Sequence, residues 1–262
     1  MIKIGNGVSW SDKKQASPSG PFTKQYQAIL NKAISLGYTL PSFDQQILQD
    51  QLIRDLKAHG IWFKLDLFYN FATDAGSAFA TINWKNPDLY QATLFNSISF
   101  SNNQGFTGNG VNTYIDTGFN LVLGTNYTQN NASRYVYGSG DGVQDIFDGN
   151  ANNSHNTFRC DDSTNQKINQ ALSSISPSLG YSAGLGMKSI HRTSASDIVL
   201  IDNLSQATRT VTSKSLINST QLVFRSQTQY GDSTIYMYAV GASLVNENSD
   251  FVQDYNNYIN SL

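Results

Sequence analysis

Apolar residues recur at helical spacing in two stretches of the first sixty residues. The first begins after Pro21, a residue suited to the first turn of a helix, and ends at Gly37. The second begins at Ser42, with Gln45 three positions later as in a capping box, and ends at Gly60. We therefore predict two helices. Residues 1–20 show little periodicity and predict an extended arm.

The pattern between residues 61 and 73 fits two structures. The odd-numbered positions are all apolar, which is typical of a strand, whereas the polar residues Asp66, Asn70 and Thr73 share one helical face. Periodicity does not decide between them. We interpret the segment as a short helix that packs on the preceding one.

From residue 78 onward, short alternating runs are separated by Gly, Asn and Asp turns, which indicates strands. These runs are 79–84, 97–100, 114–117, 134–137, 145–147, 157–160, 182–192, 197–201, 207–211, 221–225 and 234–240. So many short strands predict two stacked antiparallel sheets. Apolar residues at helical spacing after Ser249 predict a C-terminal helix that is capped by this serine and packs against one edge. The expected organisation is 1–42 arm and first helix, 43–77 helical connector and 78–262 sandwich.

Composition excludes several classes of function. Only 14% of the 262 residues are charged, and a net charge of −2 provides no attraction for nucleic acid. The single cysteine, Cys160, forms no internal disulfide, and the sequence shows no export signal and no apolar run long enough to span a membrane. These features predict folding in the cytoplasm, with neither nucleic acid nor membrane as a partner.

Four stretches carry a resemblance to a known family. They are 56–66, 82–87, the glycine-rich 105–118 with its Tyr-Ile-Asp-Thr-Gly ending, and 191–203. Together they are similar to the concanavalin A-like (LamG-like) jelly-roll domains of tailed-bacteriophage structural proteins, over about residues 43–262. The resemblance implies a mainly β jelly-roll sandwich and a structural role in a virion, on the tail, fibre, baseplate or capsid surface. It supplies no catalytic residues.

The expected partners and location follow from that resemblance and from the arm. We expect other virion proteins to hold the chain through residues 1–42, possible homo-oligomers, and a virion location after folding in the host cytoplasm. We expect no cofactor.

Oxygen-bearing side chains are densest between residues 141 and 153. Asp141, Asp145 and Asp148 are candidate calcium ligands, because calcium prefers carboxylate oxygens in loops. Tight turns use the same residue types, and the spacing differs from that of an EF-hand.

The alternative from a different class of function is a glycan-binding module that recognises a host-surface polysaccharide. Sugar sites combine aromatic faces with amides and aspartates, and Tyr135, Tyr137, Asp148, Asn150 and Asn153 are the candidates. Alternating tyrosines also stabilise a sheet by cross-strand packing, so the pattern serves either purpose.

Catalysis is disfavoured by the carboxylates. Retaining glycoside hydrolases place two carboxylates about 5 to 5.5 Å apart, and the glucanases of the same superfold resemble one another in a Glu, Asp and Glu strand. This chain contains one glutamate, Glu247, whose position before the last helix favours a capping role. We therefore expect a structural protein or a glycan-binding module and not an enzyme.

Overall fold

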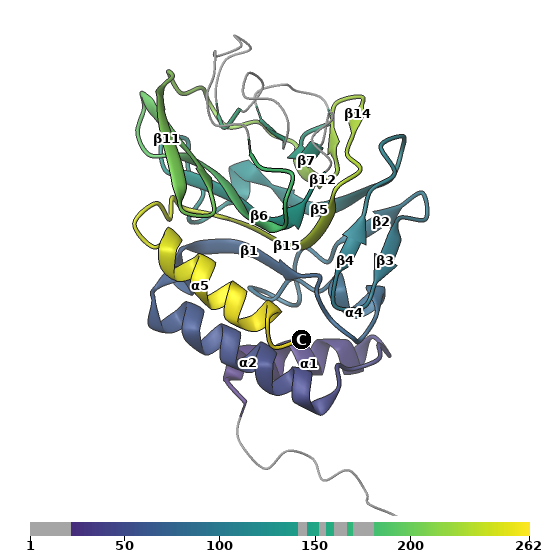
Figure 1. Ribbon diagram of the computed structural model, residues 1–262. Coiled ribbons are helices and arrows are strands. Elements are labelled where there is room, and N and C mark those ends of the chain that lie inside the picture. The colour runs from purple at the N-terminus through teal and green to yellow at the C-terminus, as the bar shows by residue number, and fades with distance from the viewer. Residues whose placement is uncertain (1–21, 141–145, 152–155, 160–166, 170–180) are drawn as a thin grey trace, which may run out of the picture.

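The chain folds into a layer of helices and two stacked sheets. The computed structural model describes residues 22–140, 146–151, 156–159, 167–169 and 181–262. Figure 1 shows α1, α2 and α5 on one side of the long strands β1 and β15, with the smaller sheet on the other side. The prediction of a mainly β antiparallel sandwich with N-terminal helices and a C-terminal helix is confirmed.

Within the described residues, the larger sheet has eight strands and the smaller one has five. The larger runs in the order β11 (Ser205–Thr210), β10 (Asp197–Asp202), β9 (Gly186–Arg192), β6 (Ala132–Ser139), β15 (Thr234–Gly241), β4 (Gly105–Thr107) and β3 (Ser99–Ser101), with β1 (Leu65–Asn70) also paired to β15. The smaller runs β2 (Thr93–Phe95), β5 (Tyr114–Asn120), β12 (Thr220–Val223), β7 (Ile146–Gly149) and β8 (Thr157–Arg159). A hairpin of β13 (Arg225–Ser226) and β14 (Gln229–Tyr230) follows β12.

Each of the two long N-terminal helices begins after a residue whose side chain caps it. α1 (Lys24–Ser35) has Thr23 as its N-cap, so it begins later than predicted, and Pro21 lies outside the described residues. α2 (Phe43–Ala58) begins as predicted, with the Ser42 hydroxyl accepting from the backbone N–H of Gln45. It ends before Gly60, whose φ of +74° suits a residue without Cβ.

The prediction of a helix over residues 61–73 is wrong beyond Lys64. A single turn, α3 (Ile61–Lys64), leads directly into β1, which pairs antiparallel with β15. β1 has apolar side chains on both faces because one face meets the second sheet and the other meets the helices. Part of the segment 43–77 that was expected to be a helical connector is therefore a strand of the sandwich. The strand expected at 79–84 is also wrong, because α4 (Ser77–Ala80) occupies its beginning.

Two apolar cores hold the layers together. Alternate residues of β15 divide between them: Tyr238 and Val240 point into the core between the sheets, whereas Met237 and Ala239 point toward the helices. Both faces of the larger sheet are thus covered at β15, whereas the edge strand β11 is largely exposed.

The C-terminal helix was expected to pack against one edge of the sandwich. It lies instead across a face of the larger sheet. α5 (Asn248–Ile259) packs on β6 and β15, and the Tyr255 hydroxyl donates to Asn70 Oδ1 at 2.8 Å and to the carbonyl of Tyr236 at 3.0 Å. Glu247, and not Ser249, is its N-cap residue. The Glu247 side chain makes no capping bond and pairs with Lys64 Nζ at 2.7 Å. No helix among the described residues is long and apolar enough to cross a membrane.

Candidate functional site

The two tyrosines expected to contact a glycan lie beneath α5. The Tyr135 ring is fully buried with its centroid 4.9 Å from that of Phe251, and the Tyr137 ring lies 4.8 Å from that of Tyr255. The Tyr137 hydroxyl donates to Asn256 Oδ1 at 2.9 Å. These side chains join the sheet to the helix, which is the packing alternative considered for the same pattern.

Asp148 lies between the two sheets. Its carboxylate accepts from the guanidinium of Arg134 and, at 2.8 Å, from the hydroxyl of Tyr238, and both members of the ion pair are fully buried. Burial raises the pKa of Asp148 to about 6, although the charge of Arg134 and the bond from Tyr238 oppose the rise. Asn150 is also buried, and its amide donates to the carbonyl of Thr220 at 2.7 Å.

The predicted site residues therefore do not form a surface. Tyr135 and Tyr137 lie on the opposite side of the larger sheet from Asp148. Asn153, Asp141 and Asp145 lie outside the described residues. Among the residues that the structure does describe, no three His, Cys, Asp or Glu side chains are placed to hold a metal ion together.

A different set of aromatic side chains is accessible on the outer face of the smaller sheet. Phe95 and Tyr114 are stacked with ring centroids 4.4 Å apart and planes within 4°. The guanidinium carbon of Arg225 lies 4.7 Å from the Tyr114 ring and 5.4 Å from the Tyr230 ring. We call Phe95, Tyr114, Arg225 and Tyr230 the aromatic row. All four are partly exposed.

The register of the strands assembles half of this row. Ile115 and Phe119 of β5 point into the core between the sheets, so Tyr114 and Asp116 point outward. β2 pairs with β5 so that Phe95 lies directly opposite Tyr114, the position in which cross-strand side chains meet.

The β13–β14 hairpin supplies the other half. Phe224 is buried in the core between the sheets and has a φ of +65°, which is a rare conformation for an aromatic residue. The reversal there ends β12 and carries the next residues onto the outer face. In the hairpin Arg225 lies directly opposite Tyr230, so both side chains reach the row together.

The polar groups of the row are largely unused by the described protein. Among the described residues, no hydrogen bond is made by the hydroxyls of Tyr114 and Tyr230. Arg225 donates from Nε to the carbonyl of Gln227 at 3.0 Å. Asp116 accepts from the backbone N–H of Gly118 at 2.8 Å and remains partly exposed. The row thus combines accessible ring carbons with donors and acceptors on one face.

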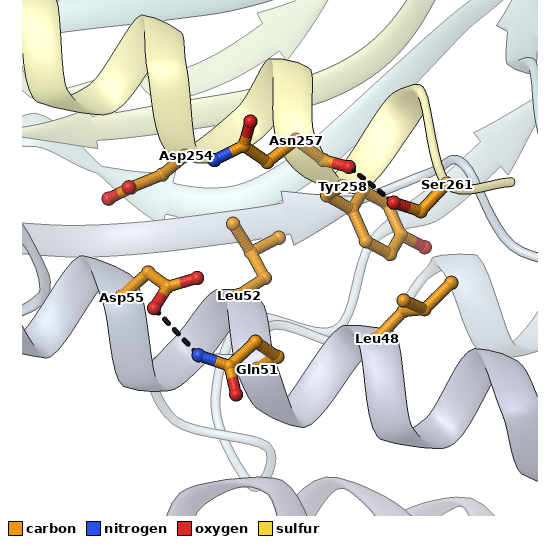
Figure 2. A pocket seen from close by; sticks show the side chains of 8 residues that line it. All are labelled: Leu48, Gln51, Leu52, Asp55, Asp254, Asn257, Tyr258 and Ser261. Carbon is orange, nitrogen blue, oxygen red and sulfur yellow. Dashed lines mark hydrogen bonds between the residues drawn. The ribbon is translucent and has the colours of Figure 1, made fainter.

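A groove between α2 and α5 is a second candidate site, on the helical side of the protein. Figure 2 shows Asp55 and Gln51 on α2 facing Asp254 and Asn257 on α5 across it. Its volume is about 100 Å³, below the roughly 300–1,000 Å³ of common small-molecule sites. Beyond it, His59 Nδ1 lies 2.9 Å from Asp254 Oδ2, and this hydrogen bond raises the pKa of the histidine. The contacts across this groove serve helix packing.

Comparison with known proteins finds distant structural likeness only. No family model and no curated protein matches the sequence. Among solved structures, the botulinum neurotoxin serotype D binding domain is 13% identical with a TM-score of 0.47, covering 76% of this chain and 53% of that one. Domain 4 of the extracellular arabinanase AbnA from Geobacillus stearothermophilus, in complex with arabinotriose, is 11% identical with a TM-score of 0.43, covering 72% and 98%.

A mutant of Trypanosoma rangeli sialidase is 9% identical with a TM-score of 0.47, covering 82% of this chain and 39% of that one. The chain therefore spans about half or less of two of these proteins. At such identities and TM-scores, the activities and ligands of those proteins are not transferred to this chain. The residues of the aromatic row are the feature of this chain that bears on its function.

Proposed function

We propose that this protein binds a carbohydrate on the outer face of its smaller sheet, through the aromatic row. The observation that carries the proposal is the continuous set of contacts among Phe95, Tyr114, Arg225 and Tyr230 on a partly exposed sheet face. It replaces the buried tyrosines with an accessible set of the same chemistry.

The row matches the two kinds of surface on a sugar ring. One face of a pyranose carries mostly C–H groups, which pack on the apolar body of an aromatic side chain. The hydroxyls around the ring need hydrogen-bond partners, and the Tyr114 and Tyr230 hydroxyls, the Arg225 N–H groups and the Asp116 carboxylate supply both donors and acceptors. A ligand lying along the row would meet both kinds of group.

The stacking also lowers the cost of binding. Ordering a flexible side chain at an interface costs about 0.5–1.5 kcal/mol. The three rings and the guanidinium already hold one another in place, and they stand on paired strands. Less side-chain entropy is therefore lost when a ligand binds.

The test is a glycan array followed by calorimetry with the full chain and two variants, Tyr114→Ala and Tyr230→Ala. Each should weaken binding at least about tenfold, as expected for truncation of a central aromatic contact. Phe63→Ala is the matched control, because Phe63 is 62% exposed on α3 and lies outside the row. Equal loss in the control, retained binding in both row variants, or no binding by the unaltered protein on a broad array would overturn the proposal.

Two earlier expectations stay predictions. The virion role came from the resemblance of four sequence stretches, and locating the chain in an imaged particle would test it. The absence of catalysis would be contradicted by release of reducing ends that one Asp→Asn substitution abolishes.

A further inference from the structure

We infer that the carbohydrate bound by the aromatic row carries a carboxylate, and that Arg225 is the residue that receives it. This inference rests on the proposed function and specifies the class of its ligand. It follows from the way the guanidinium of Arg225 is held and from the bonds that it leaves unused.

The guanidinium of Arg225 is held by two ring contacts and one hydrogen bond. Its central carbon lies 4.7 Å from the centroid of Tyr114 and 5.4 Å from that of Tyr230, two rings that are themselves in contact, and its Nε–H donates to the carbonyl of Gln227. Among the described residues, its two terminal nitrogens donate to no acceptor. An arginine has five N–H groups in a rigid plane, so an edge of donors remains for a ligand. That edge matches the two oxygens of a carboxylate.

The described residues also leave Arg225 without an ion pair. Other arginines of the described chain are paired: Arg134 with Asp148, and Arg54 with Asp50. Arg192 is bound by main-chain carbonyls, including that of Ile168 at 2.8 Å. Within the described residues, the ion pairs within 4.0 Å do not include Arg225.

Asp116 is an acidic group on the same face of β5, and it forms no ion pair with Arg225 within 4.0 Å. Its carboxylate accepts from the backbone N–H of Gly118. A partly buried guanidinium that contacts aromatic rings and has no carboxylate partner among the described residues attracts an anion more strongly than a fully hydrated one does. Asp116 is left to accept from sugar hydroxyls.

The experiment compares polymers that differ in the carboxylate alone. Polygalacturonate and polysialic acid, each beside its carboxyl-reduced form, are titrated into the full chain and into Arg225→Gln and Arg225→Lys. Arg209→Gln is the matched control, because it removes the same charge from β11 at the far edge of the other sheet. Thermal midpoints of all variants establish that the hairpin stays folded.

We expect the unaltered protein to bind one carboxylated polymer at least about tenfold more tightly than its reduced form. Arg225→Gln should abolish that difference, Arg225→Lys should retain part of it, and Arg209→Gln should leave it unchanged. Equal binding of the two forms, an unchanged preference in Arg225→Gln, or no binding to either polymer would overturn the inference. Binding of neutral glycans that depends on Tyr114 would then leave the proposed function standing, whereas loss of that dependence would overturn both.

Discussion

Replacing Arg134 by methionine tests the ion pair at the centre of the sandwich. Arg134 and Asp148 have no exposed surface, and Asp148 also accepts from the Tyr238 hydroxyl at 2.8 Å. Methionine keeps most of the apolar stem and removes the charge, so the carboxylate is left buried without its partner. Breaking a buried pair in this way costs about 3–5 kcal/mol of the free energy of unfolding. We expect that loss near pH 8.

The loss should shrink in acid. Burial already raises the pKa of Asp148 to about 6 in the presence of Arg134, whereas an unfolded chain titrates near 3.9. A carboxyl with a raised folded-state pKa contributes stability below the unfolded value and loses it as pH rises through the folded one. Without Arg134 the folded-state pKa rises further. The variant therefore keeps Asp148 protonated near pH 5 and is penalised less there.

Urea unfolding at about pH 5 and about pH 8 measures both effects. The double variant Arg134→Met with Asp148→Asn removes the buried charge altogether and should recover at least half of the loss at the higher pH. A loss that is the same at both pH values, or no recovery in the double variant, would refute the assignment of the penalty to an unpaired carboxylate.

Two further substitutions test the attachment of α5 and the close approach of β1. His59→Gln removes the imidazole whose pKa is raised above 6.5 chiefly by its hydrogen bond to Asp254. Because a raised histidine pKa stabilises the folded state at low pH, the unaltered protein should lose protection of α5 amides as pH rises from about 6 to 8, and the variant should lose less, as measured by hydrogen exchange. Gly241→Ala places a Cβ against the carbonyl oxygen of Lys64 and 2.7 Å from the Cα of Leu65, so it should lower the free energy of unfolding by about 1–3 kcal/mol in urea. Gly184→Ala, with nothing within 4 Å of the added Cβ, is its control, and equal effects of the two would contradict the steric explanation.

Rules that use only neighbouring residues were sufficient to predict most helices and strands. The cap at Ser42 and the stop at Gly60 are encoded by neighbouring residues, and the alternating runs at 114–117, 134–137 and 234–240 all lie in strands. Local rules failed where a strand is covered on both faces. β1 has apolar residues on both sides because helices and a second sheet enclose it, and such a run has no distinctive period.

The same enclosure explains why the tyrosines of β6 were misassigned. In a two-layer sandwich every second residue of a strand faces solvent, and Tyr135 and Tyr137 would then be accessible. Here α5 forms a third layer over that face. Which face a distant helix covers depends on the whole chain path and is absent from the period of the strand.

The aromatic row could be anticipated only in part. Tyr114 belongs to the glycine-rich stretch that carries the resemblance, and its outward alternation with Asp116 is visible in the sequence. Its partners come from two other segments, Phe95 and the residues of the β13–β14 hairpin. Their convergence depends on the left-handed conformation of Phe224, which no sequence rule assigns to an aromatic residue.

The layer order itself directs where a ligand can bind. The central strands of the larger sheet are covered by helices on one face and by the smaller sheet on the other, so their side chains serve packing, and the Arg134–Asp148 pair joins the two sheets. No helix of the described residues lies over the outer face of the smaller sheet (Figure 1), and the β13–β14 hairpin covers that face at β7, where a side chain at Gly149 would collide with Ser226. That hairpin also carries Arg225 and Tyr230 to the open part of the face, beside Tyr114. The change of chain direction at Phe224 therefore has two effects on the outer face of the smaller sheet. It places the hairpin over β7, and it places the charged Arg225 beside Tyr114.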